Sequence, residues 1–184
     1  MNLFITFLEI GFKHILEGYD HLLFLAGLIV VSKSLKQLLP VVTAFTIAHS
    51  ATLILSAFGI ISLNPLLTET LIAVSIVYVG VENIFKEKFN GRWLIAFGFG
   101  LVHGAGFSGH LTALLQSVMG TGQIWSSLIG FNIGIELGQV VVILIAFPLL
   151  FLIRKKVKQE TLVPVFSSAI AMVGFVLVIT RLWF

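Results

Sequence analysis

The chain has 184 residues, of which 58% are hydrophobic and only 10% are charged, and its mean hydropathy is +1.11. A soluble domain of this length would carry about a quarter charged residues, so the composition excludes an ordinary soluble protein. The lack of cysteine excludes disulfides, thiolate metal sites and iron–sulfur clusters. The formal charge of +3 does not indicate a nucleic-acid partner, because the basic residues are scattered singly or in short connections.

The apolar segments are continuous, and almost all of them exceed the roughly 20 residues that cross the hydrocarbon of a bilayer as a helix. Continuous runs favour helices over the alternating pattern of a membrane β-barrel. We therefore predict an all-α membrane protein that forms a single integral-membrane domain over residues 1–184, with six transmembrane helices. In chain order these helices cover residues 3–31, 38–58, 67–85, 92–118, 124–153 and 162–183.

The short connections between these segments predict the orientation of the chain. Lysine and arginine occur in the first, third and fifth connections and are missing from the second and fourth. Because basic residues accumulate on the cytoplasmic side, we predict that both termini lie outside the cytoplasm. Arg181 and Lys13 run against this pattern. Met1 is followed directly by an apolar run, without the basic region or small-residue cleavage site of a signal peptide, so the chain either inserts through its first helix or is a processed form.

A local pattern recurs between the first and fourth segments. Gly11, His14 and His21 match Gly100, His103 and His110 at an offset of 89 residues, and residues 45–48 resemble 131–134 at an offset of 86. The pattern predicts two inverted three-helix repeats, residues 1–88 and 89–184, of the kind that holds a binding site between its halves in secondary transporters. Chance similarity among helices rich in glycine and phenylalanine is the alternative.

Ionisable side chains at membrane depth are costly, and they commonly mark an ion path, a proton relay or a cofactor. In the first segment His14 and His21 are seven residues apart, so both lie on one face of a continuous helix, with Glu17 between them and Asp20 at the border. Imidazoles and carboxylates are ligands that divalent transition metals prefer. A bound cation would offset the cost of burying them, whereas a hydrogen-bonded knot that only fixes helix packing is the alternative.

Histidines also occur in the second and fourth segments. His49 lies among small residues in the middle of its segment, with Thr46 and Ser50 one turn away or adjacent. His103 lies in a stretch with five glycines in 12 residues, and His110 follows nearer the predicted outer surface. Glycines let neighbouring helices approach closely, which would bring His103 towards ligands on other helices, although they can also serve packing alone.

Two further carboxylates lie in apolar segments. Glu136 has Asn132 and Gln139 one turn to either side, which forms a polar stripe, and Glu82 either has a functional role or pairs with Lys86. The predicted metal ligands are therefore His14, Asp20, His21, His49, His103, His110 and Glu136, with Glu17, Glu82 and Asn132 in secondary positions.

With His14-x5-Asp20-His21 in the first segment and Val-His-Gly-Ala-Gly-Phe over 102–107 in the fourth, the chain resembles the HupE/UreJ family of small bacterial membrane proteins associated with nickel supply. The similarity extends over essentially the whole chain. It implies nickel permeation, or handling of nickel for hydrogenase or urease maturation, with His14, Asp20, His21 and His103 at the family's motif positions.

One departure from the family's second motif, Phe-His-Gly-x-Ala/Val-x-Glu, bears on the choice of metal. Val102 precedes the histidine, and Ser108 stands where the family has glutamate. We therefore add Ser108 to the secondary positions. Glu136 or Glu82 is the candidate to replace the missing carboxylate. Imidazole and carboxylate sites suit nickel, cobalt, zinc and copper alike.

We therefore expect a permease for divalent transition metals, nickel first among them, and favour a transporter over an enzyme. Without a nucleotide-binding motif, transport would be passive or coupled to another ion. A membrane metalloenzyme or haem-holding protein, and a structural or receptor protein with a buried polar knot, are the alternatives. The expected partners are the metal ion and the lipid bilayer, with a homo-oligomer as an option.

Overall fold

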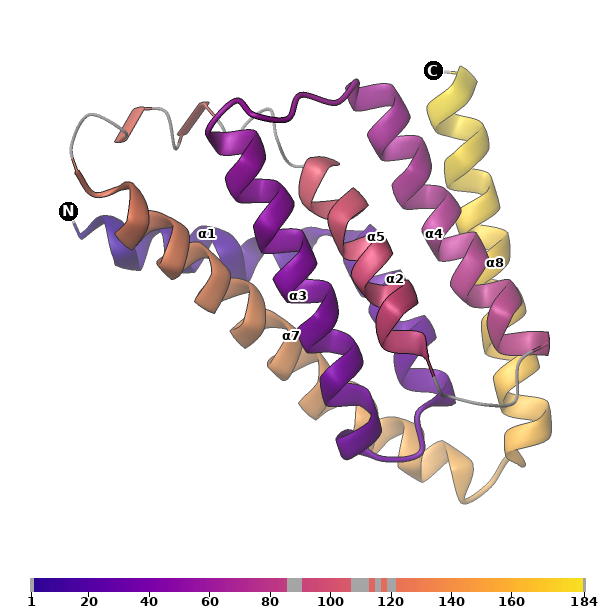
Figure 1. Ribbon diagram of the computed structural model, residues 1–184. Helices are drawn as coiled ribbons and strands as arrows, with labels where there is room; N and C mark the ends of the chain where they lie inside the picture. The colour runs from indigo at the N-terminus through magenta and orange to yellow at the C-terminus, as the bar shows by residue number, and fades with distance from the viewer. Residues whose placement is uncertain (1, 86–90, 107–112, 115–116, 119–121, 184) are drawn as a thin grey trace.

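The computed structural model describes residues 2–85, 91–106, 113–114, 117–118 and 122–183. Within this part of the chain the long elements are all helices and no residue is in a strand, which confirms the all-α prediction (Figure 1). They are α1 (Leu3–Glu17), α2 (Tyr19–Val31), α3 (Leu35–Ala57), α4 (Pro65–Phe85), α5 (Arg92–Gly106), α7 (Ile124–Arg154) and α8 (Gln159–Trp183).

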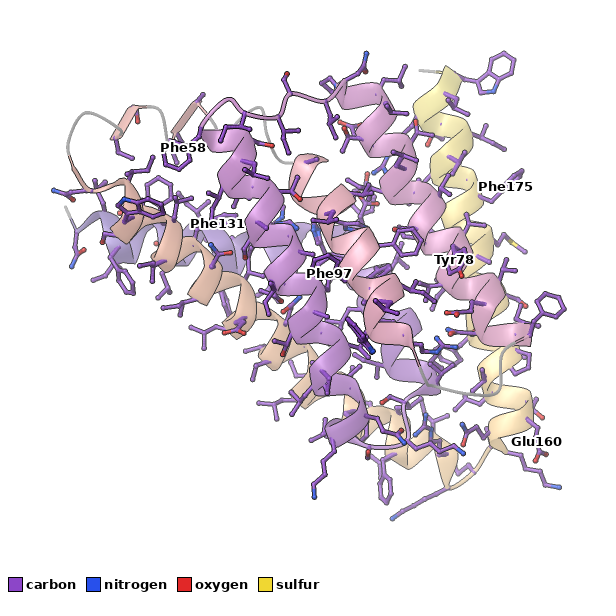
Figure 2. All side chains as sticks on the ribbon, viewed as in Figure 1. Phe58, Tyr78, Phe97, Phe131, Glu160 and Phe175 are labelled. Carbon is purple, nitrogen blue, oxygen red and sulfur yellow. The ribbon has the colours of Figure 1, made fainter. Side chains whose placement is uncertain are left out.

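The helices have the length and composition of membrane spans. α3, α4, α7 and α8 are each long and apolar enough to cross a bilayer, and α1 with α2 raises the number among the described residues to five. The outer surface is apolar: Phe175 points away from the bundle in Figure 2 and Phe97 is also exposed, whereas Phe131 is buried. The chain is thus a multi-pass membrane protein. The predicted fourth span is helical as α5 up to Gly106, and residues 107–112 lie outside the described residues.

The prediction of one unbroken helix over residues 3–31 is wrong. α1 and α2 meet at Gly18 with a bend of 67°. Gly18 has a non-helical backbone (φ −78°, ψ 86°), and its N–H donates to the carbonyl oxygen of His14 at 3.1 Å, which ends α1. A Cβ at this position would overlap that oxygen and lie 2.8 Å from Nδ1 of His21. The glycine is therefore what lets the chain turn so tightly between two histidines.

Three helix pairs build the bundle: α1 packs along α7, α3 along α5, and α4 along α8. α2 contacts α4, α7 and α8 as well as α1 and α3, so it lies at the centre of the described helices. Glycine permits the close contacts in these pairs, since Gly11 lies against the backbone of Phe131 and Gly100 against that of Phe45, with no space for a Cβ.

Arginine 154 joins two connections at one end of the bundle. Its guanidinium donates to the carbonyl oxygens of Ser32 and Val30, both at 2.9 Å. The connection from α7 to α8 therefore lies beside the connection from α2 to α3, at the lower end of the bundle in Figure 1. Both connections carry basic residues.

Candidate metal centre

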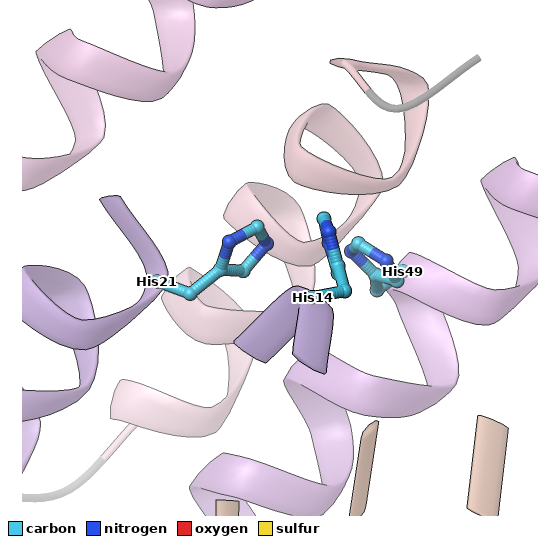
Figure 3. Close-up of side chains that lie close together, drawn as sticks. All are labelled: His14, His21 and His49. Atoms are coloured by element: carbon cyan, nitrogen blue, oxygen red, sulfur yellow. The ribbon is translucent and has the colours of Figure 1, made fainter. Parts of the chain in front are cut away.

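Four histidines from four helices gather near the break between α1 and α2. The rings of His14 and His21 lie 4.6 Å apart between centroids, and the His49 ring lies 5.8 Å from His14 and 5.7 Å from His21 (Figure 3). The ring of His103 lies 5.0 Å from that of His21. Residues from both halves of the sequence therefore contribute to one cluster.

Two glycines account for this convergence. The turn at Gly18 begins α2 directly after α1, so His14 and His21 approach each other across a bend instead of along one helical face. Gly104 on α5 lies against the backbone of His49 on α3, with no space for a Cβ. The absence of side-chain bulk at this crossing brings His49 and His103 into the same region of the bundle.

Three of the four histidines are buried, His14 is partly exposed, and apolar rings form part of the wall. His49 is 0% exposed, His103 is 1% exposed and His21 is 9% exposed. The rings of Phe24 and Phe45 lie 5.3 Å and 5.1 Å from that of His103 and form part of the wall. Water is therefore largely excluded, and polar atoms in this region depend on the protein or on a ligand for partners.

Most of the imidazole nitrogens here lack such a partner. Within the described residues, both ring nitrogens of His21 and both of His49 are buried and make no hydrogen bond. His103 is held through Nε2, which lies 2.9 Å from Oγ of Ser75. Because the single hydroxyl proton of Ser75 can be donated to the Ile72 carbonyl at 2.6 Å, Oγ is left to accept from Nε2–H. That arrangement leaves the Nδ1 lone pair of His103 for a ligand.

The spacing suits a metal ion. His14, His21 and His49 offer ligand atoms that all lie within 4.8 Å of one another. Metal–nitrogen bonds of about 2.0–2.1 Å allow two ligand nitrogens to be at most about 4.2 Å apart, so small ring rotations would complete the coordination. An ion would also satisfy nitrogens that are otherwise buried without partners. The residues present therefore fit a transition metal bound by imidazoles.

The carboxylates predicted from the sequence are placed differently from one another. Asp20 borders the cluster, but its Oδ2 lies 2.6 Å from Nη2 of Arg181 in an ion pair. Glu82 lies away from the histidines and pairs with the buried Arg92, with 3.4 Å between Oε2 and Nη1. Glu17 is exposed, and Glu136 is exposed where it lines a hollow between α3 and α7 together with Thr46 and Gln139. None of these four carboxylates belongs to the close histidine group found among the described residues.

The remaining predicted positions lie on the seam between α3 and α7 or outside the described residues. Ser50 donates to Oδ1 of Asn132, and Thr46 donates to Oε1 of Gln139 at 2.8 Å, so these side chains join α3 to α7 beside His49. His110 and Ser108 lie outside the described residues.

Sequence reasoning missed several residues that shape this region. Ser75 gave no signal, because a serine in an apolar helix is common in packing. Arg92 was taken only as the start of a span, although it is 2% exposed and bonded to Oδ1 of Asn83 at 2.5 Å. Arg181 did give a signal, since it runs against the charge pattern of the connections, and its pairing with Asp20 gives the physical reason.

Fold and site together define the class: a multi-pass helical membrane protein with a buried imidazole cluster that could hold a metal ion. The chain belongs to the HupE/UreJ family, since the sequence model for HupE/UreJ proteins matches residues 1–184. This family is associated with the handling of metals, nickel among them. No curated protein and no solved structure matches the chain.

Proposed function

We propose that the protein is a permease for divalent transition metals, with nickel as its first candidate, and that His14, His21 and His49 hold the ion inside the bundle. The observation that carries the proposal is the set of buried ring nitrogens of His21 and His49, which make no hydrogen bond within the described part of the chain and whose rings lie close to other imidazoles. A hydrogen-bonded network that serves helix packing alone would satisfy these nitrogens with its own donors and acceptors. His103, oriented by Ser75, is the adjacent fourth ligand.

Ion release is as necessary as ion binding in a permease. Neutral imidazoles bind divalent metals without placing several negative charges in the membrane, so they favour moderate affinity. Ligand nitrogens must be deprotonated, and binding therefore competes with protons. In the proposed path the ion enters from the non-cytoplasmic side, is held where α1 meets α2, and leaves towards the cytoplasm. His110, Asp20 and Glu136 remain proposed contributors to this path.

The finer architecture forms part of the same proposal: six spans in a bacterial inner membrane, two inverted repeats and both termini outside. In support, α5 begins 89 residues after α1, and α7 begins 89 residues after α3. Gly11 lies against Phe131, and Gly100 lies against Phe45. In the sequence repeat Gly100 is the equivalent of Gly11 and Phe131 is the equivalent of Phe45, so the two contacts correspond to each other. The contact of Arg154 with the connection from α2 to α3 supports the grouping of basic connections on one side.

A haem-holding role is less compatible with the space around the histidines. The cavity that His21 lines has a volume of about 10 Å³, which is enough for a single water molecule. A porphyrin would have to separate rings that now lie within 6 Å of one another. A small ion needs no such rearrangement.

The test is metal flux into proteoliposomes that contain a metal-sensitive dye, for wild type and for His21→Ala and His49→Ala. We expect nickel-dependent uptake by wild type and near-complete loss in both variants, with helical content unchanged by circular dichroism. Glu9→Gln is the matched control, because Glu9 is exposed and its ion pair within the described residues is with Lys13 on the same helix. Equal flux in the histidine variants would contradict the proposal. Stoichiometric binding without flux would indicate a metal-holding protein instead.

A further inference from the structure

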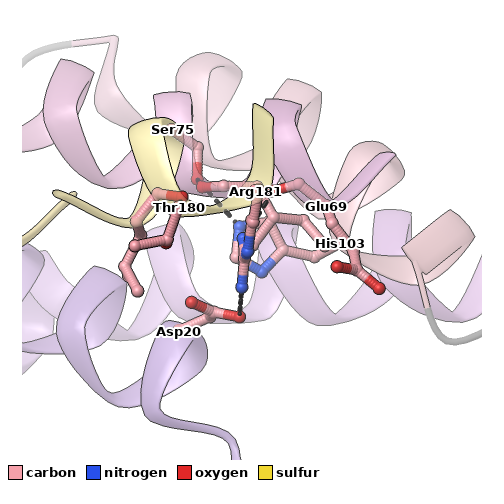
Figure 4. Close-up of polar contacts among 8 residues, drawn as sticks. Asp20, Glu69, Ser75, His103, Thr180 and Arg181 are labelled. Atoms are coloured by element: carbon pink, nitrogen blue, oxygen red, sulfur yellow. Dashed lines mark hydrogen bonds and ion pairs between the residues drawn. The ribbon is translucent and has the colours of Figure 1, made fainter. Parts of the chain in front are cut away.

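Arg181, in the last turn of α8, joins this helix to the segment that carries His21 of the histidine cluster. Its Nη2 lies 2.6 Å from Oδ2 of Asp20, and its Nη1 donates to the carbonyl oxygen of Glu69 on α4 (Figure 4). The side chains of Arg181 and Asp20 are 12% and 17% exposed. The pair thus connects α8, α4 and α2 in a region where little solvent weakens the attraction between the two charges.

Asp20 has a second oxygen that the arginine does not use. Oδ1 is buried and makes no hydrogen bond within the described part of the chain. Asp20 lies in the first turn of α2, directly before His21. The carboxylate therefore has one oxygen held by Arg181 and one oxygen unpartnered, next to a residue of the histidine cluster.

The charges of this arrangement bear on cation binding. A guanidinium does not lose its proton in a protein, so Arg181 is a permanent positive charge. It would repel a divalent ion in the cluster, and it also neutralises the carboxylate of Asp20, which directly precedes His21 and would attract such an ion. In a poorly solvated region both effects are larger than at a protein surface.

We propose that Arg181 is the resident counter-cation of Asp20 and lowers the affinity of the histidine cluster for divalent metal ions. The ion and the guanidinium compete for the same carboxylate, which keeps binding weak enough for release. Arg181 then sets the affinity of the cluster for the metal. Because Arg181 belongs to α8, metal binding at the histidines also affects the contact between α8 and α2. This inference rests on the metal-binding function proposed above.

The test is the affinity of detergent-solubilised protein for Ni²⁺, measured by isothermal titration calorimetry. Arg181→Gln removes the charge, and we expect binding at least about tenfold tighter, since a unit charge is removed near a divalent ion in a weakly screened site. Arg181→Lys retains the charge and should restore the wild-type affinity to within about threefold. In Asp20→Asn/Arg181→Gln the gain should disappear, because no carboxylate is released.

Controls separate this role from a structural one. Arg154→Gln is the matched control, because Arg154 is also partly buried and its hydrogen bonds within the described residues go to backbone carbonyls at the other end of the bundle, so this substitution should leave affinity unchanged. Arg181→Met replaces Arg181→Gln if the latter does not fold. Unchanged or weaker binding in folded Arg181→Gln or Arg181→Met, while wild type binds Ni²⁺, would overturn the inference alone. No binding by wild type and by Arg181→Gln would instead overturn the proposed metal function.

Discussion

Substitution of Gly104 by alanine tests how the cluster is assembled. Gly104 on α5 faces the backbone of His49 on α3, and a Cβ there would lie 2.9 Å from both the carbonyl carbon and the Cα of His49, and closer still to its carbonyl oxygen. Neither helix backbone can rotate away as a flexible side chain would. The helices must therefore separate, and His49 must move with its own backbone.

The size of the effect follows from this overlap. Ordinary contacts of a Cβ begin at about 3.4 Å, so relief of the overlap with the His49 carbonyl oxygen would require the helices to separate by about an ångström. Overpacking of this kind costs about 1–3 kcal/mol. Gly98 is the matched control on the same helix, because a Cβ at that position meets nothing within 4 Å. Gly98→Ala should be neutral or stabilising by up to about 1 kcal/mol, since alanine favours helix more than glycine does.

The assay is thermal unfolding in mild detergent without metal, together with Ni²⁺ titration of the folded variants. We expect Gly104→Ala to have the lower melting temperature. Displacement of His49 should also weaken metal binding at least about tenfold, which corresponds to a loss of about 1.4 kcal/mol of binding free energy. Gly98→Ala should match wild type in affinity. Equal stability and equal affinity in the two alanine variants would refute the argument that close helix approach assembles the site.

Three other predictions concern the break, the buried ion pair and protons. Gly18→Ala should weaken metal binding, because its Cβ would overlap the His14 carbonyl oxygen and crowd the His21 ring, and titration of the folded variant checks this. Glu82→Ala removes the carboxylate that neutralises buried Arg92 and should cost about 3–5 kcal/mol in unfolding measurements while metal affinity is retained. Lowering the pH should weaken metal binding, and metal addition should release protons, because protons and the metal compete for the ring nitrogens. Calorimetry in buffers of different ionisation enthalpy measures the proton release. An affinity that does not depend on pH would contradict imidazole ligation.

The helical class and much of the histidine group could be predicted from the sequence, because apolar length and intramembrane ionisable residues are strong signals. The convergence of His14 with His21 was expected for the wrong reason. A seven-residue spacing places two side chains on one face only if the helix continues, and Gly18 interrupts it. A single glycine in an apolar run is compatible with either outcome, so local sequence could not decide this point.

Partners of the carboxylates could not be predicted, because they depend on contacts between distant segments. Asp20 and Arg181 are 161 residues apart, and no local pattern joins them. Glu82 pairs with Arg92, which is ten residues further along the chain, whereas its candidate partner in the sequence, Lys86, lies outside the described residues. The glycines of the fourth segment, by contrast, were correctly expected to admit a neighbouring helix, since Gly100 and Gly104 both lie against α3.

The most direct test of the central claim is X-ray absorption at the nickel edge on protein loaded with one equivalent of Ni²⁺ in detergent. Imidazole ligation predicts several nitrogen neighbours at about 2.0–2.1 Å, with the multiple-scattering pattern of histidine rings. His49→Ala should reduce the histidine contribution. A first shell of water and carboxylate oxygens alone, unchanged in His49→Ala, would contradict the claim that the histidine cluster holds the metal.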